Sequence, residues 1–83
     1  MFEIFFTNKA ENQLKKLEKN VQQRIIAVLE RSRIRPEDHF ERLVGEKAYK
    51  LRVGDYRIIA DIDNNKLVIL VLKLGHRKNI YER

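Results

Sequence analysis

The 83-residue sequence contains no cysteine. It can therefore form neither a disulfide framework nor a thiolate metal site, which suits a reducing compartment such as the cytosol. It also has no hydrophobic run of membrane-spanning length and no signal-peptide pattern at its start, so we expect a cytoplasmic protein without membrane contact. The single proline and three glycines mark local turns, because no low-complexity segment or linker divides the chain.

Length and charge narrow the class of protein further. A chain of 83 residues with 43% hydrophobic content can bury one modest core, so we expect a single domain over residues 1–83. The net charge is +6, and most of the excess lies in residues 42–83, which carry 10 basic and 5 acidic side chains. Such a balance favours RNA, DNA, the ribosome or an acidic protein as a partner.

The first residues predict a strand followed by a helix. Residues 2–6 (FEIFF) are aromatic and β-branched, which favours a short strand. Either Thr7 or Asn8 can cap the helix that follows, and Glu11 stands in the capping-box position relative to Asn8. Apolar residues then recur at helical spacing, and we expect this first helix to end near Asn20.

A second helix is predicted from Val21 toward Pro36, because the apolar spacing resumes there and the residue before a proline disfavours helical geometry. The two helices should form a hairpin. Residues 32–45 are polar without clear periodicity, so they should cross from the helices to a sheet, with His39, Phe40 and Leu43 as candidate anchors.

The second half of the chain predicts three strands, at residues 48–53, 56–63 and 66–74. They are joined by Gly54-Asp55 and Asn64-Asn65, which are two-residue hairpin signals. Glycine at the first turn position suits a type II′ turn, and two asparagines tolerate the positive φ of type I′. The predicted fold is therefore α+β: a short N-terminal strand, a helix hairpin and a three-stranded antiparallel meander in one sheet, with the helices on one face.

The first hairpin sets a register that places two arginines face to face. With Gly54-Asp55 as the turn, Arg52 lies opposite Arg57, and Lys50 shares their face. Like charges opposed on a sheet are destabilising by a few tenths to about 1 kcal/mol, so an anion between them would explain the pair. The other face should pack against the helices through Tyr49, Leu51, Val53, Tyr56, Ile58, Ala60 and Ile62. The last strand should add Val68, Leu70 and Leu72 as a floor beside the cations.

These elements resemble the RelE/ParE superfamily of toxins from bacterial and archaeal toxin–antitoxin operons, and within it the RelE branch of ribosome-dependent mRNA interferases. The resemblance spans nearly the whole chain and rests on the strand and helix hairpin, on YKLRVGDYRIIADI and on the terminal GHRKNIYE. It implies a toxin that enters the ribosomal A site and cleaves mRNA by metal-free transesterification, with no cofactor. The implied partners are mRNA, a 70S-type ribosome and a cognate RelB-like antitoxin, with a toxin–antitoxin heterotetramer as one candidate assembly.

The resemblance also implies roles for individual residues. Arg57 matches the arginine that clamps the scissile phosphate. Lys50 and Arg52 match a basic pair of which one cation assists deprotonation of the 2′-OH and the other neutralises the phosphate, although arginine is a poor base. Arg77 matches an arginine that supports the leaving 5′-oxygen, and Tyr81 matches a tyrosine that stacks on a substrate base.

Two features depart from the simplest family pattern. Tyr81 lies only four residues beyond Arg77, which is closer than in the best-known RelE pattern. His76 is additional, and because imidazole transfers protons near neutrality it could act with Glu41 as an acid–base pair, as in related interferases. The two histidines are too differently placed along the chain to suggest a metal site.

Plainer interpretations of the same residues stay open. Arg57 could form a structural ion pair with Asp55 or Asp61, and the cations of residues 50–52 could protect an edge strand against aggregation. Tyr81 could anchor the chain end to the core. At the level of the whole protein, the alternatives are a ParE-like toxin that poisons DNA gyrase without nuclease activity and a catalytically inactive RNA- or ribosome-binding module.

Overall fold

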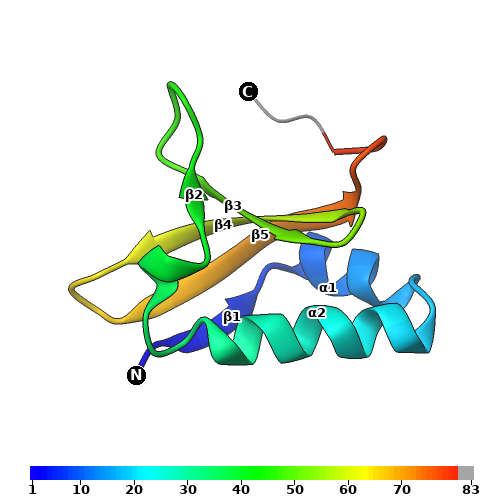
Figure 1. The fold of residues 1–83 in the computed structure, drawn as a ribbon, viewed down its shortest axis with the longest axis horizontal. Helices are drawn as coiled ribbons and strands as arrows, with labels where there is room; N and C mark the ends of the chain where they lie inside the picture. Colours follow the sequence, from blue (N-terminus) through cyan, green and yellow to red (C-terminus); the bar gives the residue numbers. More distant parts are fainter. Residues whose placement is uncertain (81–83) are drawn as a thin grey trace.

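The computed structural model describes residues 1–80, and it packs two helices against one face of a five-stranded sheet (Figure 1). The strand order is β1-β5-β4-β3-β2, in which β1 is parallel to β5 and all other neighbours are antiparallel. This arrangement confirms the predicted α+β class. The elements are β1 (Glu3–Phe6), α1 (Asn8–Lys15), α2 (Lys19–Arg31), the 3-10 helix η1 (Pro36–Asp38), β2 (Glu41–Arg42), β3 (Tyr49–Val53), β4 (Tyr56–Asp63) and β5 (Val68–His76).

We call the sheet face toward the helices the inner face and the opposite one the outer face. The inner face and the helices enclose the main core, and its fully buried side chains include Ile25 and Leu29 of α2, Ile58 of β4 and Ile69 of β5. A second, smaller cluster lies on the outer face. It consists of Leu43, Ile59 and Ile80, with Ala48 and Leu72 packed against it.

Helix α1 starts where β1 ends. Thr7 is the cap residue: its hydroxyl oxygen accepts a hydrogen bond from the Ala10 N–H at 3.1 Å, while its carbonyl accepts the Glu11 N–H at 2.9 Å. Of the two predicted caps, Thr7 therefore holds the position and Asn8 is the first residue of the helix. The cap satisfies one of the backbone donors that a helix start leaves without an intrahelical partner.

The boundary between the helices differs from the prediction. We expected a break near Asn20, but α2 already begins at Lys19, after the cap residue Glu18. Asn20 therefore lies in the first turn of α2. At the turn between the helices, Gln22 Nε2 donates at 2.7 Å to the carbonyl of Leu17, the residue after the cap residue Lys16 of α1.

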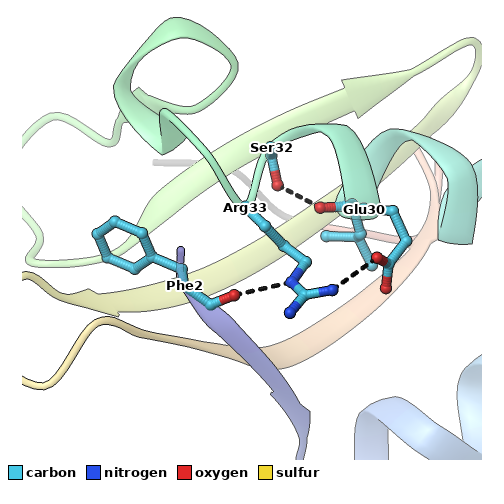
Figure 2. Close-up of polar contacts among 5 residues, drawn as sticks. Phe2, Glu30, Ser32 and Arg33 are labelled. Carbon is cyan, nitrogen blue, oxygen red and sulfur yellow. Dashed lines mark hydrogen bonds and ion pairs between the residues drawn. The ribbon is translucent and has the colours of Figure 1, made fainter.

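The end of α2 is tied to the N-terminus of the chain (Figure 2). Arg33 Nε donates to the Phe2 carbonyl at 2.8 Å, its Nη1 lies 2.8 Å from Glu30 Oε1, and its own carbonyl accepts the Phe2 N–H at 2.8 Å. The buried Ser32 hydroxyl donates to the Leu29 carbonyl at 2.7 Å. These contacts hold β1 in place at the edge of the sheet.

The connection from the helices to the sheet contains more structure than the sequence indicated. Its aperiodic segment forms η1 and then β2, which pairs with β3 so that Glu41 is the partner of Lys50. Phe40 and Leu43 are buried and confirm two of the three predicted anchors, whereas His39 is exposed. In Figure 1 the hairpin of β2 and β3 rises from the sheet on the side away from the helices.

The hairpin of β3 and β4 has the predicted register: Arg52 pairs with Arg57, and Val53 with Tyr56. Gly54 has a φ of +58°, and within residues 1–80 Leu67 is the only non-glycine residue with positive φ. Asp55 thus keeps a negative φ, as a type II′ turn requires. Glycine is needed here because a side chain in the left-handed region is costly.

The connection from β4 to β5 is longer than predicted. Asp63 pairs with Val68, so residues 64–67 all belong to the loop, and the expected two-residue Asn64-Asn65 turn is wrong. The Asp63 side chain explains the difference, because its Oδ1 accepts the N–H groups of Asn65 at 2.9 Å and Lys66 at 3.0 Å. The positive φ of the loop falls on Leu67, at 55°.

Strand β5 carries a β-bulge that the sequence did not reveal. Ile59 pairs with Lys73 but its neighbour Ala60 pairs with Val71, so Leu72 is an extra residue. The edge of β5 at this point faces α1 rather than β1. The Thr7 hydroxyl donates to the Leu72 carbonyl at 2.9 Å, and Gln13 Oε1 accepts the Leu74 N–H at 2.8 Å. Side chains near α1 thus satisfy the backbone groups beside the bulge.

Candidate functional site

Five basic side chains gather on the outer face around the turn between β3 and β4. Alternation along the strands places Lys50, Arg52 and Arg57 opposite the inner-face residues that pack on the helices. Arg52 and Arg57 form one row with Gly75 of β5, and Lys50 forms the next row with Ile59 and Lys73. Arg77 follows directly after β5. We call this set, Lys50, Arg52, Arg57, Lys73 and Arg77, the basic face.

Arg57 lies at the centre of the basic face and is largely enclosed. The residue is 7% exposed, and its Nη1 donates to the carbonyls of Gly54 at 3.2 Å and Tyr56 at 3.1 Å. The guanidinium therefore helps to hold the hairpin turn. Within residues 1–80, no salt bridge joins it to Asp55 or Asp61. Direct contact with a phosphate requires a movement that exposes it.

A hollow of about 310 Å³ is lined by His39, Glu41, Lys50 and Arg52, the Cα partner of Arg57. Lys50 Nζ lies 3.8 Å from Glu41 Oε1, and the Lys50 side chain is 17% exposed while that of Glu41 is 77% exposed. The carboxylate thus tethers the ammonium group at the wall of the hollow. Arg52 is exposed at its rim, so the hollow offers two cations to an anion entering from solvent.

Arg77 is brought to the same turn by a continuation of the ladder beyond β5. Its N–H donates to the Asp55 carbonyl at 2.8 Å, and its Nε lies 4.0 Å from Asp55 Oδ1. Both side chains are more than half exposed, so this pair contributes little stability and the guanidinium can readily exchange partners. Asp55, a predicted alternative partner for Arg57, pairs with Arg77 instead.

His76 lies apart from the basic face. Its Cα partner is Tyr56, an inner-face residue, and the two rings meet edge to face with centroids 5.5 Å apart and an interplanar angle of 77°. The His76 Nδ1 accepts the Lys78 N–H at 3.2 Å. Glu41 lies on the outer face with Lys50, so the structure does not bring the proposed pair of His76 and Glu41 together. Tyr81 lies outside the described residues.

Lys73 is the cation that sequence reasoning missed. Strict alternation puts Leu72 on the outer face and Lys73 on the inner one, but the bulge presents both on the outer face. Leu74, the next residue, packs in the main core, which fixes the opposite direction for Lys73. The bulge residue Leu72 ends an apolar run from Val68, so no turn residue or glycine at the bulge itself signals it.

The floor beside the cations is only partly the predicted one. Leu72 does pack with Ile59, next to Lys50 and Lys73. Val68 and Leu70 lie farther along the outer face, where their Cα partners are Asp63 and Asp61. The outer face therefore divides into a basic end at the β3–β4 turn and an acidic end near the β4–β5 loop, a polarity that would orient an extended anionic chain.

Within residues 1–80 no group of three or more His, Cys, Asp or Glu side chains is placed to hold a metal ion. Neither α1 nor α2 is long and apolar enough to cross a membrane.

Comparison with known families decides the class of protein. A family model described as the ParE toxin of the type II toxin–antitoxin system, parDE, matches residues 4–81. The chain belongs to this toxin family. The match confirms the resemblance to the RelE/ParE superfamily and makes the protein a type II toxin–antitoxin toxin. A comparison with curated proteins gives no match.

Solved structures show that the toxin shares its fold with RelE proteins. A chain of the toxin–antitoxin complex RelBE2 from Mycobacterium tuberculosis matches with a TM-score of 0.79 and 24% identity, over 92% of this chain and 98% of that one. The intact RelBE complex from E. coli matches with a TM-score of 0.77 and 25% identity, over 92% and 96% of the two chains. The archaeal RelE–RelB complex from Pyrococcus horikoshii OT3 matches with a TM-score of 0.76 and 23% identity, over 95% and 98%.

Proposed function

We propose that this toxin is a ribosome-dependent endoribonuclease that cleaves mRNA in the A site without a metal ion. The observation that carries the proposal is the convergence of Lys50, Arg52, Arg57 and Arg77 on one end of the outer face. Glu41 pairs with Lys50 and Asp55 pairs with Arg77, but cations placed next to one another on strands also attract an external anion, and a phosphate of the RNA backbone is such an anion. The cytoplasm is the compartment in which this substrate occurs.

The reaction is attack of a ribose 2′-oxygen on the adjacent phosphorus. A new 2′-oxygen–phosphorus bond forms, the bond from phosphorus to the 5′-oxygen breaks, and the products are a 2′,3′-cyclic phosphate and a 5′-hydroxyl. The 2′-OH proton must be removed and the leaving oxygen must gain one. The phosphorane carries extra negative charge, which preorganised cations can stabilise in a partly enclosed site.

The geometry supports one role for each cation. Lys50, held at the hollow by Glu41, stabilises the negative charge on the 2′-oxygen as its proton passes to water. Arg52, exposed at the rim of the same hollow, neutralises the phosphate. Arg57 supplies positive charge beneath the phosphorane, and Arg77 supports the leaving 5′-oxygen because its weak pair with Asp55 lets it exchange partners.

Primer extension on mRNA in a translating extract tests the proposal. Wild-type toxin should produce breaks confined to A-site codons, and Arg77→Ala should lower the cleavage rate by about 100-fold because it removes a cation that acts in the transition state. Arg31→Ala is the matched control, since it removes an exposed arginine from the end of α2. Arg57→Ala belongs in the series with a thermal melt beside it, because Arg57 also holds the hairpin turn. Intact mRNA with the wild-type toxin would refute the proposal.

A gyrase poison is the second candidate, and a specific observation favours it: the family model that matches the chain is that of the ParE toxin. Such a toxin acts through protein contact and needs no reacting phosphate. A supercoiling assay with purified gyrase separates the two candidates. Inhibition of supercoiling without mRNA breaks would assign the gyrase role, whereas A-site breaks with normal supercoiling would assign the nuclease role.

We further propose that a cognate antitoxin covers the basic face. The structurally similar chains from M. tuberculosis, E. coli and P. horikoshii come from complexes of RelE with RelB. With a net charge of +6, this toxin should bind a segment that is rich in acidic residues and wraps the outer face. Such a segment would block access to Arg52 and Arg77 and so prevent cleavage.

A further inference from the structure

The bulge in β5 adds a cation to the outer face that neither the motif nor the family resemblance assigns. Lys73 and Leu72 both point outward at the point where Val71 and Leu74 point into the main core. A bulge re-aims side chains and interrupts a ladder, and bulges recur next to functional sites. Here the polar groups beside it are satisfied by Thr7 and Gln13, so the bulge is a supported part of the fold.

The position of Lys73 relative to the other cations is set by the sheet. Lys50, Ile59 and Lys73 form one row across three neighbouring strands. Strand spacing of about 4.8 Å puts the two lysine Cα atoms about 10 Å apart. Gly75, two residues after Lys73, lies in the row of Arg52 and Arg57. Two residues of a strand span about 7 Å, so Lys73 lies about 7 Å along β5 from that row. Lys73 is thus close to the proposed reaction centre without being part of it.

The surroundings of Lys73 suit an external anion. It is half-buried and its Cα partner is Ile59, so its apolar stem can lie along the outer face while its charged head stays in water. Within residues 1–80 it forms no salt bridge, in contrast to Lys50 and Arg77, which pair with Glu41 and Asp55. Between the two lysines Ile59 is buried by Leu43 and Ile80. An extended nucleic acid strand that passes over this cluster would meet Lys50 on one side and Lys73 on the other.

We propose that Lys73 binds a backbone phosphate of the RNA substrate next to the phosphate that is cleaved. This inference rests on the proposed ribonuclease function and extends its site from β3 and β4 onto β5. Lys73 contributes to binding rather than to the chemical step, because the cations around Arg57 surround the reacting phosphate and Lys73 lies one step along the strand. Its contribution should therefore appear in affinity and in the salt dependence of affinity.

Binding of a fluorescent, 2′-O-methylated mRNA codon on programmed ribosomes tests the inference, since this RNA cannot be cleaved. Lys73→Met removes the charge and keeps most of the apolar stem, and Lys66→Met in the exposed β4–β5 loop makes the same change in net charge away from the basic face. We expect Lys73→Met to weaken binding about 3- to 10-fold and to lower the slope of log K against log salt by about 0.7. Lys66→Met should leave both within twofold of wild type, and Lys73→Arg should restore them.

Single-turnover cleavage at saturating toxin completes the test. Lys73→Met should cleave within about twofold of the wild-type rate, because its role lies in binding. Equal affinity and salt slope for Lys73→Met and Lys66→Met, with wild-type cleavage intact, would overturn the role of Lys73 while leaving the ribonuclease function standing. If Lys73→Met binds normally but cleaves much more slowly, the binding role is also wrong. If the wild-type toxin neither binds nor cuts, the proposed function itself fails, and this role fails with it.

Discussion

Gly75 and Ile80 together decide how the segment after β5 packs on the outer face. A Cβ atom at Gly75 would lie 3.2 Å from Ile80 Cγ1 and 3.4 Å from its Cδ1. The backbone at Gly75 does not have positive φ, so a side chain there is allowed by conformation and limited by space. Alanine needs only a small shift of Ile80. Valine adds two further methyl groups in the same space, and we predict that Gly75→Val displaces Ile80 from its cluster.

The size of the effect follows from the burial of Ile80. The residue is 8% exposed and packs with Leu43 and Ile59. Full burial of an isoleucine side chain stabilises a protein by roughly 1.5–3 kcal/mol, so displacement of Ile80 should remove about 2 kcal/mol of stabilisation. Replacing a glycine also lowers the conformational entropy of the unfolded chain, which raises the free energy of unfolding by roughly 0.4–1 kcal/mol. Gly75→Val should therefore lower the free energy of unfolding by about 1–2 kcal/mol.

A double-mutant cycle with Ile80→Ala isolates this contact. In the Ile80→Ala background the space beside Gly75 is empty, so Gly75→Val should be neutral or slightly stabilising. The interaction free energy between the two changes should then be at least about 1 kcal/mol. For independent sites, the effect of the double mutant equals the sum of the single effects within roughly 0.5 kcal/mol. Urea unfolding followed by circular dichroism measures all four proteins. Additive effects would refute the reasoning, because they would mean that Ile80 does not pack over Gly75.

Two further predictions concern the turn and the cap that position the basic face. Gly54→Ala should lower the unfolding free energy by about 1–2 kcal/mol because Gly54 has a φ of +58°. The added Cβ would lie 2.8 Å from Arg24 Nη2, but this is the end of a flexible side chain, so most of the loss should persist in an Arg24→Ala background. Complete rescue by Arg24→Ala in urea unfolding would instead assign the loss to this clash. Thr7→Val should cost about 1–2 kcal/mol because it removes both the acceptor for Ala10 and the donor to Leu72. Thr7→Ser should retain most of the stability, and faster amide exchange of Ala10 in Thr7→Val would locate the loss at the cap.

The parts of the fold that depend on neighbouring residues were predictable. The turn at Gly54-Asp55 is closed by residues next to each other in sequence, so its two-residue length and the pairing of Arg52 with Arg57 follow directly. The alternation that sends Ile58 into the main core and Arg57 outward follows from the same register. The family resemblance was likewise carried by local motifs.

The incorrect or missing predictions involve interactions between distant segments or competition by side chains. The β4–β5 loop lengthens because the Asp63 carboxylate captures two backbone N–H groups in place of a tight turn at Asn64-Asn65. Strand β2 exists because β3 offers it an edge, which a two-residue segment cannot signal by periodicity. The Leu72 carbonyl at the bulge accepts a hydrogen bond from the Thr7 hydroxyl, and the two residues lie 65 positions apart in the sequence.

In the candidate site, too, local sequence places some residues and contacts between distant segments place the others. By itself the sequence determined the basic end of the first hairpin, since Lys50, Arg52 and Arg57 are placed by one turn and a period of two. The tertiary structure decided the rest: it enclosed Arg57, joined Lys50 to Glu41, turned His76 to the inner face and brought Lys73 outward. The physical reason is that a face is set by local alternation, whereas burial, ion pairing and a break in alternation depend on which distant elements pack alongside.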